Sequence, residues 1–255
     1  MPLQVHQFPC RSDNYGFLAH DPQSGLTACV DTPETDAINA ALEEKGWHLT
    51  HILNTHHHGD HTEGLAQLAA QTGAKVFGPA GDQPGHQAIQ SKLADGDRFE
   101  FAGTPVEVIA TPGHTLDMLN YYLPDQSVCF TGDTLFALGC GRVFEGTAEM
   151  MWNSLSKLMV LPADTVLYSS HEYTAANARF AVTIEPENQA LAARAKAVEA
   201  LRADNQPTVP SVLGEELATN PFLRAADTAV RAHLGMADAT DSAVFAEIRS
   251  RKDNF

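Results

Sequence analysis

The stretch LNTHHHGDHTEG, Leu53–Gly64, is the most distinctive part of this sequence. Four histidines and one aspartate fall within six residues of it, directly after an apolar run. His56 and His58 are two residues apart, so their side chains point the same way in an extended segment. Asp60 and His61 lie past the following turn and can face a second point. Because imidazole and carboxylate suit zinc, iron and manganese, the spacing predicts a divalent metal site with room for two adjacent ions.

Three further candidate ligands occur later in the chain, each just after an apolar run. They are His114 in VIATPGHT, Asp133 in CFTGDTLF and His171 in LYSSHEY. Each follows an expected strand, and strand ends are where open α/β sheets gather their sites. Taken singly, the two histidines could be turn residues and the aspartate a turn or cap residue, and the cluster itself could be a polar loop. Together they make a set of five histidines and two aspartates, which favours two metal ions.

Composition and charge narrow the class of protein. With 255 residues, of which 44% are apolar, the chain is long enough for one or two domains with an ordinary core. Its formal net charge of −16 argues against nucleic acid as a partner, because phosphate binding needs a basic face. Residues 1–171 contain only seven of the sixteen lysines and arginines. An anionic ligand that reaches this part therefore needs bound metal, or cations supplied by residues 172–255.

The four cysteines, Cys10, Cys29, Cys129 and Cys140, show no C-x-x-C spacing. Two disulfides are the alternative, but packed, reduced thiols fit scattered cysteines better. The opening MPLQVHQFPC has neither a basic region nor a long apolar region, so no secretory signal is expected. No apolar run reaches the roughly 18 residues of a membrane span. We therefore expect a cytoplasmic monomer that binds no membrane.

Short strands with helices between some of them are predicted for the first half of the chain. A helix in DTPETDAINAALEEKG has Thr32 as N-cap, Pro33 at its first position and Gly46 at its end. A strand in LTHILNT, a helix in TEGLAQLAAQTG and a strand in AKVFG follow, an alternation typical of helix-covered sheets. DRFEF, TPVEVIAT, LNYYL and SVCFTG add strands without helices between them, so these should be at least partly antiparallel. The strands expected before the first helix are Val5–Phe8, Tyr15–Ala19 and Thr27–Val30.

Helical patterns dominate after about residue 172. PENQALAARAKAVEALRADN is helical throughout, and AADTAVRAHLG and DSAVFAEIRSRK indicate two more helices. No internal repeat or long flexible linker is visible. The sequence therefore predicts two domains, a metal-binding domain of residues 1–171 and a helical domain of residues 172–255.

The ligand pattern resembles that of a known group of proteins. H-x-H-x-D-H, then TPGHT, GDT and a late histidine are similar to the metallo-β-lactamase superfamily. The resemblance implies an α+β fold, an αββα sandwich with a dinuclear site at one edge. The ligands that it implies are His56, His58 and His114 for one ion, Asp60, His61 and His171 for the other, and Asp133 between them.

Two such ions narrow the chemistry to hydrolysis or redox. Ions that share an oxygen ligand lower the pKa of bound water to near neutrality and so generate hydroxide. Asp60 and Asp133 are the carboxylates expected to take part in catalysis beside it. No G-x-S-x-G motif is present, and Cys140, between two glycines, is expected to be a small packed residue. Zinc is the expected metal, and iron and manganese are the alternatives.

Further stretches narrow the substrate. GCGRVFEGT, HEYTAANARFA, NPFLR, the terminal IRSRKDNF and the opening DNYGFLAHD closely resemble the glyoxalase II family, the hydroxyacylglutathione hydrolases. The resemblance covers essentially the whole chain. It implies hydrolysis of the thioester S-D-lactoylglutathione to D-lactate and glutathione, the second step of methylglyoxal detoxification. The residues that it implies for substrate binding are Arg142, Phe144, Tyr173, Arg249 and Lys252.

Two of these cations also have a simpler interpretation. Arg249 and Lys252 are three residues apart, hence on one helical face. Cations near a helix C-terminus interact well with its dipole and stay solvated. Tyr173 would add a hydroxyl beside His171, and a buried core tyrosine is the alternative.

The sequence departs from the family pattern in two places. Arg142–Phe144 stand where the family often has lysine, an aromatic residue and tyrosine, so one hydroxyl contact to glutathione is expected to be missing. Asp117 and Met118 stand where Gly-His is common, which we expect to alter the surroundings of His114. His57 is not a ligand in this scheme and is expected to face solvent.

Three alternative functions follow from the same residues. A glutathione persulfide dioxygenase with a single iron shares much of the His/Asp spacing but lacks the long helical part. A β-lactamase would need an export signal. A metal-binding protein without catalysis, with the helical part binding a partner, would not need a complete set of ligands.

Overall fold

The computed structural model describes residues 2–255, and the chain forms two compact units. Unit 1 is the chain up to Ala110 together with Asp117–Gly132, and unit 2 is Thr111–Leu116 together with Asp133–Phe255. The change in composition near residue 172 falls inside unit 2. Within the described residues, no helix is both long and apolar enough to cross a membrane.

Unit 1 contains a six-stranded sheet whose strands follow the order of the sequence. The first three strands pair antiparallel, and each later strand joins in parallel. The parallel part is the strand–helix alternation that the sequence predicted, because parallel neighbours need a crossover connection. The strands are β1 (Gln4–Cys10), β2 (Asn14–His20), β3 (Thr27–Val30), β4 (His51–Leu53), β5 (Lys75–Pro79) and β6 (Ser91–Leu93).

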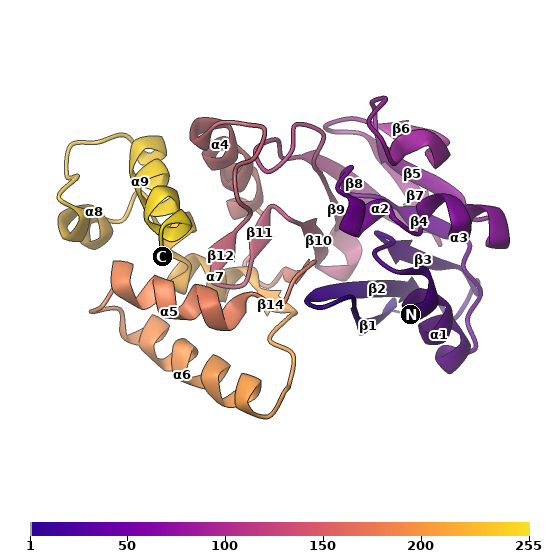
Figure 1. Ribbon diagram of the computed structural model, residues 1–255, viewed down its shortest axis with the longest axis horizontal. Helices are drawn as coiled ribbons and strands as arrows, with labels where there is room; N and C mark the ends of the chain where they lie inside the picture. The colour runs from indigo at the N-terminus through magenta and orange to yellow at the C-terminus, as the bar shows by residue number, and fades with distance from the viewer. Residues whose placement is uncertain (1) are drawn as a thin grey trace. The chain divides into compact units, whose positions relative to one another are not determined.

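Helices α1 (Thr35–Lys45) and α3 (Leu65–Thr72) cover one face of this sheet (Figure 1). Ile38 of α1 and Leu68 of α3 are fully buried in one apolar cluster with Ile52 of β4. Full burial of one such side chain contributes about 1.5–3 kcal/mol. The apolar positions of these helices therefore fix them on the sheet.

Helix α1 begins two residues later than the sequence indicated. Glu34, not Thr32, is its N-cap residue, and its side chain makes no cap hydrogen bond. Thr32 instead donates to the carbonyl of His61, from its backbone N–H at 2.9 Å and from its hydroxyl at 3.3 Å. The expected end at Gly46 is confirmed, since its φ of 67° is a conformation that glycine adopts without strain.

Four antiparallel strands of unit 1 belong to a second sheet, as the sequence predicted. They are β7 (Arg98–Phe101), β8 (Thr104–Ala110), β9 (Leu119–Leu123) and β10 (Val128–Gly132), with the short 3-10 helix η2 (Pro124–Gln126) before β10.

The two sheets of unit 1 pack face to face through aromatic side chains. Phe77 of β5 stacks on Phe99 of β7 with ring centroids 4.6 Å apart. Tyr121 of β9 is fully buried, and its hydroxyl donates to the carbonyl of Asn54 at 2.5 Å. Asn54 follows β4 directly and opens the histidine-rich segment. The core between the sheets therefore fixes where that segment begins.

Unit 2 is mostly helical, and α5 and α6 pack against each other through small and apolar residues (Figure 1). The helices that the sequence predicted after residue 172 are confirmed as α6, α8 and α9. Its elements are β11 (Leu135–Phe136), β12 (Gly139–Cys140), α4 (Ala148–Met159), β13 (Val166–Ser169), α5 (Thr174–Ile184), α6 (Gln189–Ala203), β14 (Ser211–Val212), α7 (Leu213–Thr219), η3 (Pro221–Leu223), α8 (Thr228–Leu234) and α9 (Asp241–Asp253).

Strands β11 and β12 form a short hairpin with Ala137 and Leu138 at its tip. Leu138 has a φ of 56°, a left-handed conformation that costs a non-glycine residue roughly 1–2 kcal/mol. Its side chain is fully buried in the cluster that joins α5 and α6. Burial of the leucine offsets the strain of its backbone.

All four cysteines are free and buried, which confirms packed, reduced thiols. Burial raises the pKa of Cys140 to about 11 and the pKa values of Cys10 and Cys129 to about 12. Cys140 is therefore a neutral, packed residue, as expected.

Candidate metal centre

The candidate ligand segment of unit 1 runs from the end of β4 into the short helix α2 (Gly59–Thr62). His56 Nε2 and His58 Nδ1 lie 3.1 Å apart, so the two side chains point the same way, as their spacing predicted. Asp60 and His61 lie on α2, and Asp60 Oδ2 is 3.4 Å from His61 Nε2. One loop and one helical turn therefore gather four of the candidate ligands.

A buried aspartate that the sequence interpretation missed, Asp31, holds both ends of this segment. One of its oxygens accepts from the backbone N–H of Thr55 at 2.7 Å, and the other accepts from the Thr55 hydroxyl at 2.8 Å. The second oxygen also lies 2.8 Å from His61 Nδ1. A histidine that donates one ring N–H to a carboxylate presents its other nitrogen to a metal. Asp31 therefore orients His61 with Nε2 toward a metal ion.

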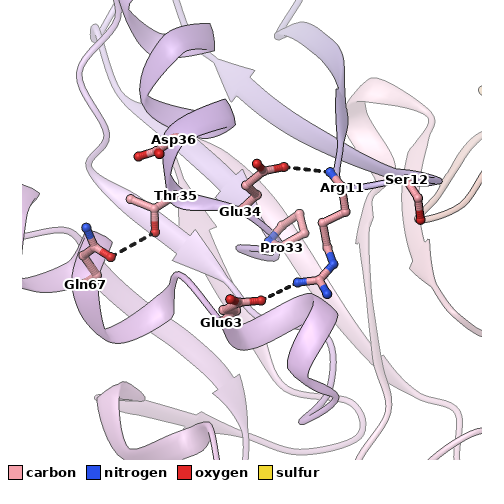
Figure 2. A pocket seen from close by; sticks show the side chains of 8 residues that line it. All are labelled: Arg11, Ser12, Pro33, Glu34, Thr35, Asp36, Glu63 and Gln67. Atoms are coloured by element: carbon pink, nitrogen blue, oxygen red, sulfur yellow. Dashed lines mark hydrogen bonds and ion pairs between the residues drawn. The ribbon is translucent and has the colours of Figure 1, made fainter.

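The turn between β1 and β2 supports Asp60. Asn14 is buried, and its side-chain Nδ2 donates to Asp60 Oδ2 at 3.2 Å. Figure 2 shows how the same turn is tethered: the backbone N–H of Arg11 donates to Glu34 at 2.7 Å, and the Arg11 guanidinium pairs with Glu63. These residues line a polar cavity of about 510 Å³ that has no candidate ligand in its described lining. The contacts around this cavity therefore hold the β1–β2 turn against the ligand segment.

The prediction that His57 faces solvent is wrong. Its side chain is 15% exposed, and its Nδ1 lies 3.0 Å from Asp117 Oδ1. The other oxygen of Asp117 is 3.2 Å from Nε2 of the buried His86, whose pKa is lowered by burial. The aspartate that departs from the family pattern therefore connects the middle of the histidine triple to the 3-10 helix η1 (His86–Ala88). This contact spans sixty residues, so no local pattern could reveal it.

Unit 2 brings the three later candidates together. His114, Asp133 and His171 are 4–6% exposed, and each comes from a different loop. Asp133 Oδ2 lies 3.4 Å from His114 Nε2 and 3.3 Å from His171 Nε2. One carboxylate oxygen thus faces two imidazoles within a buried region of unit 2.

These separations suit ligands of a common metal ion better than direct hydrogen bonds. An N–H···O hydrogen bond is usually about 2.7–3.2 Å long. Tetrahedral zinc with bonds of about 2.0–2.1 Å places neighbouring ligand atoms about 3.3–3.4 Å apart. The three imidazole–carboxylate distances between candidate ligands are 3.3–3.4 Å, one in unit 1 and two in unit 2. The residues present therefore fit divalent metal.

The loop after β12 orients His114 and packs on Asp133. His114 Nδ1 lies 2.8 Å from the carbonyl of Arg142, so Nδ1 carries the ring proton and Nε2 keeps the lone pair that a metal needs. A Cβ atom on Gly141 would lie 1.9 Å from the Asp133 carbonyl oxygen, so only glycine fits there. Gly141 therefore allows the backbone to approach two candidate ligands, Asp133 and His114.

Two exposed aromatic residues lie against the histidines of unit 2. Phe144 is 60% exposed, and its ring centroid is 5.3 Å from that of His114. Tyr173 is 37% exposed and stacks on His171 with ring centroids 4.7 Å apart. The alternative of a buried core tyrosine is therefore wrong, and both rings are available to a ligand.

Arg249 and Lys252 on α9 differ in burial. Arg249 is 7% exposed, donates from Nη1 to the Cys140 carbonyl at 3.1 Å and pairs with Asp253 at 2.8 Å. The alternative of a solvated helix-end charge is thus wrong for Arg249. Lys252 is half-buried and donates to the carbonyl of Ala176 at 3.2 Å. Burial, followed by repulsion from nearby arginines, lowers the pKa of Lys252.

Two family profiles divide the chain between them. The profile described as "Metallo-beta-lactamase superfamily" matches residues 29–171, and "Hydroxyacylglutathione hydrolase C-terminus" matches residues 172–255. A curated relative from Rhizobium meliloti (strain 1021), named hydroxyacylglutathione hydrolase, is 55% identical over 99% of this chain and 99% of its own. This chain belongs to the hydroxyacylglutathione hydrolase family. A hydroxyacylglutathione hydrolase of Brucella ovis is also 55% identical, over 99% of this chain and 98% of its own.

Among solved structures, ETHE1 from Myxococcus xanthus matches with a TM-score of 0.69. The match covers 98% of this chain and 90% of that one at 24% identity, which shows the fold alone. The expected α+β class, an αββα sandwich with a helical C-terminal part, is confirmed. As a hydroxyacylglutathione hydrolase of the metallo-β-lactamase superfamily with these histidine and aspartate groups, the chain has a divalent metal-binding site.

Proposed function

We infer that this chain is a thioester hydrolase that cleaves hydroxyacylglutathione, with S-D-lactoylglutathione yielding D-lactate and glutathione. The observation that carries this conclusion is the 55% identity to hydroxyacylglutathione hydrolases over nearly the full length of both chains. The match of residues 172–255 to the C-terminal profile of the same hydrolases supports it. The reaction would complete the detoxification of methylglyoxal.

We propose residues 1–171 as the catalytic domain and residues 172–255 as the substrate-binding domain. The ranges of the two family profiles support this division. The distribution of charge supports it too, because residues 172–255 contain nine of the sixteen lysines and arginines.

Seven side chains are proposed to bind two divalent ions. The distances within each unit support this, as do the hydrogen bonds at Nδ1 that orient His61 and His114. Zinc suits imidazole and carboxylate ligands, and iron or manganese would also be accepted. The proposed ligands are His56, His58 and His114 for one ion, Asp60, His61 and His171 for the other, and Asp133 between them.

The proposed chemistry divides between the ions and the residues of the chain. Two divalent ions bound here would polarise the thioester carbonyl and lower the pKa of water to near neutrality. Asp60 and Asp133 are proposed to take part in catalysis as the carboxylates of the site. The hydrogen bond from Asn14 to Asp60 Oδ2 restrains rotation of the Asp60 side chain. Gly141 packs directly on the backbone carbonyl of Asp133. His114 keeps its proton on Nδ1, against the carbonyl of Arg142.

Glutathione carries two carboxylates, and we propose that unit 2 supplies the groups that bind it. The Arg142 side chain is 58% exposed, and its guanidinium lies 6.0 Å from the Phe144 ring. Lys252 is the half-buried cation of α9, and Tyr173 adds an exposed hydroxyl. Arg249 belongs to the same group because it binds the carbonyl of Cys140, two residues before Arg142.

The free, buried cysteines support a reducing compartment, and we propose that the protein acts in the cytoplasm as a monomer. Sedimentation velocity would test the monomer, and a stable dimer would contradict it.

Hydrolysis of S-D-lactoylglutathione, with zinc, iron and manganese measured on the same sample, tests the proposed function. We expect the thioester to be cleaved far faster than a β-lactam or a phosphodiester, by protein that carries close to two ions per chain. Oxygen uptake with glutathione persulfide, without thioester hydrolysis, would identify a dioxygenase instead. Metal-loaded protein without either activity would be a metal-binding protein.

A further inference from the structure

The β11–β12 hairpin connects two parts of the proposed metal centre. Asp133 lies at its base, where the backbone N–H of Gly141 donates to the carbonyl of Thr134 at 3.1 Å. Gly141 packs on the Asp133 carbonyl, and the next carbonyl, of Arg142, lies 2.8 Å from His114 Nδ1. A shift of the hairpin would therefore move the backbone of one proposed ligand and the ring of another.

The hairpin has little to hold it in place by itself. Only two residue pairs form its ladder, Leu135 with Cys140 and Phe136 with Gly139. An isolated two-stranded hairpin is marginally stable in water at best. Its tip residue, Leu138, is in the left-handed conformation that leucine disfavours. Groups outside the hairpin must determine its position.

Two fully buried side chains of the helical part bind the hairpin backbone. Glu216 of α7 accepts from the N–H of Leu138 at 2.9 Å through Oε2. Asn220 donates from Nδ2 to the carbonyls of Phe136, at 3.2 Å, and Gly139, at 3.0 Å. The same Nδ2 lies 3.1 Å from Glu216 Oε2. We call Glu216 and Asn220 the hairpin clamp.

The hairpin clamp is itself fixed on its far side. Arg194 forms a buried ion pair with Oε1 of Glu216, the oxygen that does not face Leu138. Asn220 Oδ1 accepts from the backbone N–H of Phe222 at 3.1 Å. Because Oδ1 is the acceptor there, the NH₂ group of Asn220 must face the hairpin. The orientation of both side chains thus follows from their other partners.

We propose that Glu216 and Asn220 are positioning residues of the metal centre. By fixing the hairpin they hold Asp133 and His114 at the spacing of metal ligands and set the place of Arg142. The proposal rests on the proposed function for the roles of these three residues. In this proposal the helical part contributes to metal binding, in addition to supplying cations that bind substrate.

The substitution Asn220→Asp tests the hairpin clamp with little change in shape. It replaces the donating NH₂ by an oxygen that faces two carbonyls and the Glu216 carboxylate. Asn188→Asp is the matched control, because Asn188 Nδ2 also donates to one carbonyl, of Ala218 at 3.0 Å, and to one glutamate, Glu185 at 3.2 Å. Within the described chain, the side chain of Asn188 makes no hydrogen bond to the hairpin.

The first measurement is transfer of zinc from loaded protein to a coloured chelator, at a temperature where circular dichroism shows each variant fully folded. We expect Asn220→Asp to lose zinc about tenfold more readily than wild type, at the lower end of what supporting residues of metal ligands contribute. The KM for lactoylglutathione should also rise, because Arg142 is displaced. Asn188→Asp should match wild type in both. If Asn220→Asp does not fold, Asn220→Ala should also lose zinc more readily than wild type.

Equal zinc retention in Asn220→Asp and Asn188→Asp, whatever their melting temperatures, would overturn the proposal and leave the hairpin clamp a purely structural contact. Zinc transfer needs no substrate, so it tests the role of the hairpin clamp independently of the proposed function. Wild-type protein that keeps zinc but does not cleave the thioester contradicts only the proposed function. Normal hydrolysis with unchanged zinc retention in Asn220→Asp contradicts only the proposal that the hairpin clamp positions the metal ligands.

Discussion

The two units support their candidate ligands in opposite ways. Unit 1 places four of them in six residues, and one carboxylate, Asp31, binds both Thr55 before them and His61 at their end. Unit 2 takes three from separate loops and supports two of them, His114 and Asp133, through a hairpin bound by buried side chains. Those side chains belong to the helical part and are Asn177, Glu216, Asn220 and Arg249.

This difference predicts which substitutions should disturb metal binding in each unit. A consecutive segment needs few external contacts, because the chain itself fixes the spacing of neighbouring residues. Ligands from separate loops have no such constraint, so their spacing depends on tertiary contacts. Metal binding in unit 1 should therefore depend mainly on one residue, Asp31, and in unit 2 on several residues that share the task.

The largest effect is expected from Asp133→Ala, which removes the carboxylate that faces both His114 and His171. The protein should lose at least one of the two proposed ions and nearly all thioester hydrolysis, more than the roughly 10–100-fold that a supporting residue contributes. Metal analysis and kinetics on one preparation measure both. Full activity with one ion per chain would contradict the proposed bridging role.

Asp31→Asn should have the next largest effect, because an amide cannot accept from Thr55 and His61 through both of its ends. Metal affinity should fall by about 10–100-fold in chelator competition. Asp21→Asn is the control, since Asp21 closes a turn by accepting from the Ser24 N–H at 2.8 Å. If Asp31→Asn weakened metal binding less than Asn220→Asp does, the expected difference between the two units would be contradicted.

Substitutions on α9 separate a cation that binds substrate from one that also supports the hairpin. Lys252→Ala should raise KM roughly tenfold with kcat unchanged, since a hydrogen bond to a charged group contributes about 1.5–3 kcal/mol. High salt should weaken this effect if the contact is exposed.

Arg249→Ala should raise KM by a similar factor and also lower the melting temperature. It leaves the buried Cys140 carbonyl without its donor, which costs about 1–3 kcal/mol. Unchanged stability of this variant would show that the hairpin does not depend on Arg249.

The smallest effect is expected for the thiols. At pH 7 iodoacetamide should leave all four cysteines of native protein unmodified, as mass spectrometry would show, because all are buried. Burial raises the folded-state pKa of Cys140 from about 9 to about 11, so its contribution to stability is full below pH 9 and is lost as pH rises toward 11. Early alkylation of Cys140 in Asn220→Asp would show that the hairpin has loosened. Rapid labelling of wild type would contradict the packed arrangement.

Much of the fold could be predicted because its signals are local. Alternating apolar strands, the end of α1 at Gly46 and the long helix α6 each follow from a few neighbouring residues. Helix α4 was missed, although Thr147 caps it by accepting from the Met150 N–H at 3.1 Å. The position of Thr32 before Pro33 predicts a helix cap, whereas its hydrogen bonds go to His61 in a distant segment.

The proposed donor set of the metal centre, the family and hence the expected reaction all follow from the sequence alone. Residue types and short spacings carry this information, since His56 and His58 must share a direction whatever surrounds them. Only the tertiary structure decided that Asp31 orients His61, that His57 binds Asp117, and that Arg249 is buried. Each of these contacts joins residues far apart in the chain, and such pairing depends on how the sheets and helices pack.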